Sequence, residues 1–99
     1  MVKMEYKAKQ IAELLKVLAN EYRLLILCEL IKEPKTVSSL GEKINGITQS
    51  ALSQHLALLK AHGILGNSKA GQSVTYFITD DRVCEIIALL KKHYCDDGG

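Results

Sequence analysis

Residues 36–62 read TVSSLGEKINGITQSALSQHLALLKAH, a stretch that predicts two helices joined by a tight turn. Thr36 is a good N-cap for a first, short helix, because its hydroxyl can accept a hydrogen bond from a backbone N–H of the first turn. Asn45-Gly46 is a typical turn dipeptide. Thr48 can then cap a second helix that extends to about Ala61.

Two further helices are predicted before this stretch. The first covers about residues 6–18, where apolar side chains recur at helical spacing. Asn20 is a suitable N-cap for the second helix, and Pro34, the only proline of the chain, ends it. The apolar positions of the two helices are Ile11, Leu14, Leu15, Leu18, Leu24, Leu25, Leu27, Cys28 and Ile31.

A β-hairpin and a last helix are predicted after the stretch. Gly63 ends the preceding helix, and residues 64–68 and 72–79 read as two short strands around Ala70-Gly71. Asp80 or Asp81 can cap the last helix. The apolar face of that helix carries Val83, Ile86, Ile87, Leu90 and Tyr94, and residues 96–99 read as a frayed tail.

The order of these elements predicts a mainly α-helical domain with a small β-hairpin. A helix-turn-helix unit followed by a hairpin is typical of a winged helix-turn-helix, whose second helix enters the DNA major groove. We expect five helices and a two-stranded wing in a single domain over residues 1–99, with an ordered core over 5–95. A chain of 99 residues is too short for a second core.

The helix that begins at Thr48 has two different faces at 100° per residue. One arc carries Ala51, Leu52, His55, Leu56, Leu58, Leu59 and His62. The other carries short hydroxyl and amide side chains, which can read base edges in a major groove. The predicted DNA contacts are Thr48, Gln49, Ser50, Ser53, Gln54 and Lys60 on this helix, with Lys69, Gln72 and Ser73 on the wing. His55, on the apolar arc, is predicted to have a hydrogen-bonded packing role rather than a base contact.

The distribution of charge supports a surface that faces phosphates. The net charge is only +2, but residues 43–79 contain three lysines and no carboxylate. A solvated amphipathic helix would explain the pattern of this one helix equally well. A winged helix can also bind proteins instead of DNA, and an affinity that barely changes with salt would indicate that alternative.

Composition excludes several classes of protein. With 47% apolar and 24% charged residues, the chain is typical of a globular protein. It has no secretory signal and no apolar run near the ~18 residues that cross a membrane, so we expect a cytoplasmic protein. Three cysteines do not form a secreted disulfide framework. No phosphate-binding glycine loop or hydrolase motif is present, so we expect neither an enzyme nor a cofactor.

Two segments resemble the ArsR/SmtB family of regulators. Residues 18–27 (LANEYRLLIL) are similar to the opening of that family's second helix, and residues 48–56 (TQSALSQHL) closely resemble its recognition helix. The resemblance implies a homodimer formed through the first and last helices, which binds an inverted-repeat operator in double-stranded DNA, usually as a repressor that an inducer releases. The turn over 44–48 is one residue longer than in the family, which affects the aim of the recognition helix.

The metal sites of the family are not expected here. Its Cys-x-Cys pair would fall on Thr36 and Ser38, whose hydroxyls are poor ligands for soft metals. On the last helix, Arg82 and Val83 stand where a histidine ligand is needed, and an arginine cannot lose its proton to bind a metal. His93 and Asp96 are isolated near its end.

The cysteines resemble those of the HlyU/BigR/SqrR branch of the family. That resemblance implies that Cys28 and Cys95 form a redox-sensing dithiol, which oxidants or reactive sulfur join by a disulfide or polysulfide link that weakens operator binding. Cys84 lies 11 residues before Cys95 on one helix, about 16 Å away along its axis and beyond disulfide reach. Cys28 could instead be a small buried apolar residue. A metal-responsive or inducer-independent repressor of the same family is the nearest alternative.

Overall fold

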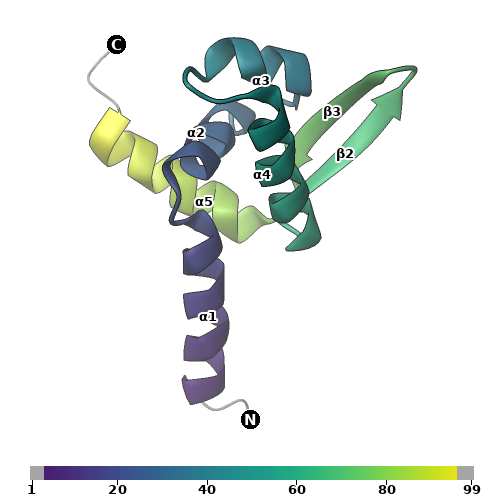
Figure 1. Ribbon diagram of the computed structural model, residues 1–99. Coiled ribbons are helices and arrows are strands. Elements are labelled where there is room, and N and C mark those ends of the chain that lie inside the picture. The colour runs from purple at the N-terminus through teal and green to yellow at the C-terminus, as the bar shows by residue number, and fades with distance from the viewer. Residues whose placement is uncertain (1–3, 96–99) are drawn as a thin grey trace.

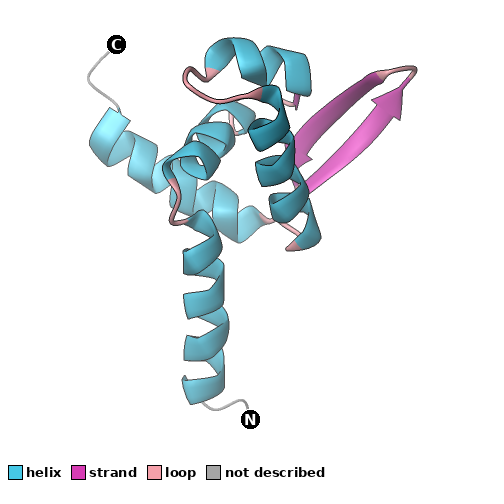
Figure 2. Ribbon diagram, viewed as in Figure 1, coloured by secondary structure: helices cyan, strands magenta, loops and turns pink. Residues whose placement is uncertain are grey.

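The computed structural model describes residues 4–95, and for Cys95 it describes the backbone alone. Five α-helices, three strands and a closing π-helical turn make up this part of the chain. Figures 1 and 2 show how the helices pack together and how the hairpin of β2 and β3 projects from them. In chain order they are α1 (Met4–Leu18), α2 (Glu21–Leu30), β1 (Lys35–Thr36), α3 (Val37–Lys43), α4 (Gln49–Ala61), β2 (Leu65–Ala70), β3 (Ser73–Ile78), α5 (Asp81–Leu90) and η1 (Lys91–Cys95). The predicted winged helix-turn-helix is confirmed, and the predicted tail lies outside the described residues.

The helices begin where the sequence predicts. Asn20 accepts hydrogen bonds from the backbone N–H groups of the first turn of α2 at 3.0 and 3.1 Å. Thr36 and Thr48 do the same for α3 and α4, each at 3.1 Å. Of the two aspartates considered for α5, Asp80 is the cap, with an oxygen 2.9 Å from the N–H of Arg82. Each cap satisfies a backbone donor that the helix itself leaves unpaired.

The wing has one more strand than the sequence predicts. The sheet order is β1-β3-β2, and Lys35 and Thr36 pair with Tyr76 and Thr75 of β3. A two-residue strand is too short to produce an alternating pattern, so the sequence carried no signal for it. Lys35 is buried, and its ammonium lies 3.4 Å from the carboxylate of Glu33, which offsets the cost of burying the charge.

The hairpin between β2 and β3 closes through Gly71 and Gln72, because Ala70 pairs with Ser73. Gly71 has a φ of 63°, whereas the φ of Gln72 is not positive. A positive φ at the first loop residue alone is typical of a type II′ turn, which favours glycine there and matches the twist of the strands. The tip therefore lies one residue later than Ala70-Gly71.

One apolar core joins all five helices to the start of β2. Its fully or nearly fully buried members are Val17, Leu18, Ile26, Leu27, Leu30, Leu40, Ile44, Leu52, Leu56, Leu59, Ile64, Leu65, Val83 and Ile87. Helix α1 contributes only its last two residues to this set. The rest of α1 extends away from the body of the molecule, as Figure 1 shows.

Candidate nucleic-acid interface

Helix α4 is anchored by one narrow apolar stripe. Leu52, Leu56 and Leu59 are completely buried, at the i, i+4 and i+7 spacing of a single helix face. Leu58 is 37% exposed and His62 is exposed, so the core covers only part of the arc to which the sequence assigned both. The stripe is narrower than the predicted arc because these two side chains lie at its edges, where the core does not cover them.

The predicted DNA-contacting residues of α4 all lie on its solvent side. Each of Thr48, Gln49, Ser50, Ser53, Gln54 and Lys60 is exposed. Lys69, Gln72 and Ser73 are exposed at the end of the hairpin, which projects beyond α4 in Figure 1. The structure thus presents a reading helix and a wing whose exposed polar side chains include no carboxylate, which suits contact with a polyanion.

Helix α2 holds α4 through a polar link. The Tyr22 hydroxyl donates to the Gly46 carbonyl at 2.9 Å, in the turn that precedes α4. Arg23 donates through Nε to the Val17 carbonyl, and its Nη1 lies 3.3 Å from Nδ1 of His55 on α4. The rings of Tyr22 and His55 lie 6.2 Å apart between centroids. The packing role predicted for His55 is confirmed by these contacts.

The contact between Arg23 and His55 requires the neutral form of the His55 ring. An arginine guanidinium only donates hydrogen bonds, so Nδ1 of His55 accepts and the ring proton lies on Nε2. Burial first, and then the positive charge of Arg23, lower the pKa of His55 below its usual value. The sequence indicated the face on which His55 lies, but a partner 32 residues away had no signal in a single sequence.

Cys28 lies in the wall of an apolar groove between α2 and α5. The groove has a volume of about 420 Å³. Its lining is apolar apart from two charged residues, and comprises Glu21, Leu24, Leu25, Cys28, Ile87, Leu90, Lys91 and Tyr94. The side chain of Cys95 lies outside the described part of the structure, so its pairing with Cys28 stays a prediction.

Cys84 differs from Cys28 in its surroundings. It is half-buried on α5, and burial together with the carboxylates of Asp81, Asp80 and Glu85 raises the pKa of its thiol. A raised pKa reduces the fraction of reactive thiolate at neutral pH. Cys84 therefore has the character of a packing residue.

Large apolar side chains are exposed on several helices. On α1, Ile11 is 54% and Leu15 is 49% exposed, and Met4 and Tyr6 are exposed as well. Leu25 of α2, Leu89 and Leu90 of α5, and Tyr94 of η1 are exposed too. Apolar surface of this extent is typical of a protein contact.

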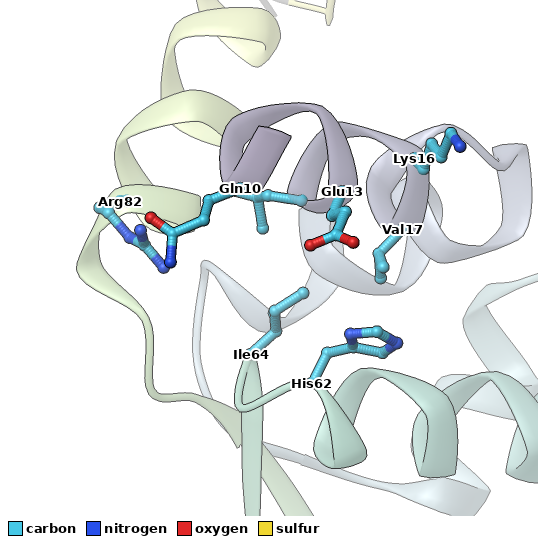
Figure 3. A pocket seen from close by; sticks show the side chains of 8 residues that line it. Gln10, Glu13, Lys16, Val17, His62, Ile64 and Arg82 are labelled. Atoms are coloured by element: carbon cyan, nitrogen blue, oxygen red, sulfur yellow. The ribbon is translucent and has the colours of Figure 1, made fainter. Parts of the chain in front are cut away.

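A polar groove of about 600 Å³ separates α1 from the end of α4 and the start of α5 (Figure 3). Figure 3 shows Gln10 beside Arg82, and Glu13 above Ile64 and His62. Nη2 of Arg82 lies 2.7 Å from Oδ2 of Asp80, so this guanidinium is already paired with a carboxylate at the edge of the groove. Within residues 4–95 no group of three or more His, Cys, Asp or Glu side chains is placed to hold a metal ion.

The carboxylate of Asp80 is engaged at the start of α5. Asp80 caps α5 and accepts from the Arg82 guanidinium at 3.1 and 2.7 Å. The hydrogen bonds to Arg82 are the main reason that the pKa of Asp80 is lowered.

No helix of the described chain is both long and apolar enough to span a bilayer.

Comparison with known proteins gives a consistent result. The family described as "Bacterial regulatory protein, arsR family" matches residues 20–66. The transcriptional regulator YgaV of Escherichia coli is 38% identical over 96% of both chains. The transcriptional activator HlyU of Vibrio cholerae is 40% identical over 93% of this chain and 84% of its own.

Solved structures of bacterial regulators are similar to this chain as well. Reduced HlyU from Vibrio cholerae has a TM-score of 0.89 at 40% identity, covering 94% of this chain and 97% of that one. The repressor BigR from Xylella fastidiosa has a TM-score of 0.83 at 30% identity, covering 97% and 94%. Both similarities extend over the terminal helices as well as the helix-turn-helix unit.

Proposed function

The chain belongs to the ArsR family of DNA-binding transcriptional regulators, and we propose that it is a homodimeric repressor whose operator affinity falls when Cys28 and Cys95 become covalently linked. The family consists of regulators rather than enzymes. One observation carries the proposal: the exposed, carboxylate-free side of α4 lies beside the wing, while Cys28 lines a groove against α5.

Sequence reading is assigned to the exposed side of α4. Gln49 and Gln54 can each form two hydrogen bonds with adenine, and Ser50 and Ser53 can pair with any base. Lys60 and the wing residues Lys69, Gln72 and Ser73 contact phosphates or the minor groove. Phosphate contacts fix the register of the protein and make its affinity depend steeply on salt.

The dimer is assigned to the exposed apolar faces of α1 and α5. These faces carry side chains such as Ile11, Leu15 and Leu89, whose burial against a second copy would stabilise a small domain. A two-fold dimer presents two copies of α4 to successive major grooves, about 34 Å apart. An inverted-repeat operator has this symmetry.

The thiol step is an oxidation of two thiols in one subunit. A disulfide or polysulfide donor accepts two electrons and both thiol protons, and leaves as reduced thiol while Cys28 and Cys95 become joined directly or through inserted sulfur. Two features support the pair: Cys28 lines the groove, and Tyr94, which precedes Cys95 in the chain, lines it too. A covalent link there would draw η1 and α5 toward α2.

The proposed consequence is a change in the spacing of the two copies of α4. Helix α2 contacts α4 directly, so a shift between α2 and α5 changes how the DNA-reading unit sits on the dimer helices. A coupling of about 1–3 kcal/mol would change operator affinity by about 5–150-fold.

The test is operator binding before and after oxidation. A duplex selected from a random library by the reduced protein serves as the probe, and fluorescence anisotropy measures binding with and without a tetrasulfide donor. We expect the unmodified protein and Cys84→Ser to release DNA on treatment and to gain an intramolecular link by mass spectrometry, whereas Cys28→Ser does neither. Release of DNA by treated Cys28→Ser would refute the thiol mechanism.

A further inference from the structure

The first turn of α2 contacts the DNA-reading unit at two separate points. Tyr22 reaches the Gly46 carbonyl, just before the N-cap of α4, and Arg23 reaches His55 in the middle of that helix. His55 lies seven residues after Thr48, about 10 Å further along the helix axis. Two contacts at this separation fix the direction of a rigid helix, whereas one would leave a pivot.

The turn is shaped to receive Tyr22. Gly46 has a φ of 80°, a conformation that side-chain-bearing residues rarely adopt. A Cβ placed there would lie 3.3 Å from the Tyr22 hydroxyl oxygen. The turn before α4 is therefore held by a side chain from another helix.

Arg23 also connects to the end of α1. Its Nε donates to the Val17 carbonyl, one of the last carbonyls of α1, which has no partner within the helix. The same guanidinium thus touches a helix of the proposed dimer face and the DNA-reading helix. Arg23 therefore gives a direct polar connection between the two surfaces that an operator-binding dimer must align.

We propose that Tyr22 and Arg23 are positioning residues for DNA binding, which set the angle of α4 through the Gly46 carbonyl and a neutral His55. The inference rests on the proposed binding of DNA by α4 and does not depend on the thiol chemistry. Protonation of His55 would remove the acceptor at Nδ1 and place two cations about 3.3 Å apart. The angle of α4, and with it operator affinity, is therefore sensitive to acid.

The surroundings of His55 contain little that would reverse this sensitivity. Among the described residues, the charged side chain that acts on it is Arg23 of α2, and the ring of Tyr22 packs beside it. The pKa of His55 is lowered, so the unfolded chain binds a proton more readily than the folded one. The contribution of His55 to folding stability is therefore fully present above about pH 6.5 and is lost as the pH falls through the lowered pKa.

The experiment measures operator affinity, dimer mass and Tm for five variants of the full chain, using the selected duplex at pH 7.5 and 5.5. At pH 7.5 we expect Tyr22→Phe to bind about 3- to 10-fold more weakly, the scale of one hydrogen bond. Arg23→Ala should bind at least as weakly, and Arg23→Lys should recover only part of the loss because it lacks the second donor that reaches Val17.

The pH profile separates positioning from simple destabilisation. His55→Gln keeps an acceptor but cannot titrate, so its affinity should fall less between pH 7.5 and 5.5 than that of the unmodified protein, in which the contact with Arg23 is lost as His55 takes up a proton. His62→Gln, at the exposed end of the same helix, is the matched control and should keep the unmodified profile.

The outcomes distinguish this inference from the proposed function. If the unmodified protein selects no duplex, DNA binding by α4 is refuted. The positioning role is refuted if the unmodified protein binds DNA and Tyr22→Phe and Arg23→Lys bind it as tightly. It is also refuted if His55→Gln loses as much DNA affinity at acid pH as the unmodified protein does.

Discussion

Helix α4 and helix α1 are both amphipathic, yet they face solvent in opposite ways. The apolar residues Leu52, Leu56 and Leu59 of α4 are completely buried, and its outward side is polar. On α1 the apolar residues Ile11 and Leu15 are half exposed or nearly so. Within one subunit, the main apolar stripe of α4 is already buried and its other side is mostly polar, whereas the apolar face of α1 remains exposed to solvent.

The difference indicates two kinds of partner. A polar surface without carboxylates gains nothing from burial in a protein core but can exchange water and counterions for a nucleic acid. An exposed apolar face gains about 25 cal/mol for each Å² that a partner covers. The first region therefore suits the proposed contact with DNA, and the second suits the proposed dimer contact.

The largest expected effect tests whether α4 is fully packed within one subunit. Leu56→Ala should lower the free energy of unfolding by about 2–5 kcal/mol, because it opens a cavity at a completely buried position. Leu58→Ala removes the same atoms from a side chain that is 37% exposed and should cost clearly less. Urea unfolding followed by circular dichroism measures both, and equal losses would contradict the packing described for α4.

The next effect concerns the apolar face of α1. Ile11→Glu combined with Leu15→Glu should give a monomer by light scattering and lower affinity for the selected duplex by about 100-fold, because the two half-sites are no longer bound together. Lys9→Gln on the same helix changes the charge by one unit without touching that face and should remain dimeric. A double variant that stays dimeric and binds DNA normally would assign the dimer to another surface.

Removing the side chains of α4 that read bases should weaken the free energy of DNA binding by about 1–3 kcal/mol for each good base contact. Gln49→Ala and Ser53→Ala remove exposed side chains from α4, so DNA affinity should fall by about tenfold or more while the Tm stays unchanged. Anisotropy with the selected duplex, and with one whose half-sites are scrambled, measures the loss. Equal affinity for both duplexes before mutation would contradict sequence reading by α4.

The sequence predicted most of the fold because the deciding signals are local. The caps at Asn20, Thr36 and Thr48 act within three residues of themselves, and the helical spacing of leucines repeats within each helix. Strand β1 escaped prediction because two residues carry no period, and it is held by pairing with β3, about 40 residues later in the chain. Local patterns specify an element but not its distant partner.

The candidate site was predictable to the same extent. The outward residues of α4 follow from its periodicity, and their exposure is as expected. The contacts that orient α4 do not follow from it, because Tyr22 and Gly46 are 24 residues apart and Arg23 and His55 are 32 apart. A sequence shows which residues can meet DNA, whereas their aim depends on packing between helices.

The smallest expected effect concerns the wing, whose exposed polar side chains extend the DNA-facing surface of α4. Lys69 is exposed near the hairpin tip, and Lys69→Ala should weaken binding only a few-fold and by a similar factor for every duplex sequence, because a phosphate contact carries no sequence information. The slope of log affinity against log salt should fall in magnitude by about 1. Lys7→Ala, on exposed α1, removes the same charge away from α4 and the wing and should leave that slope unchanged. A slope that Lys69→Ala leaves intact would place the wing off the DNA and assign the phosphate contacts to α4 alone.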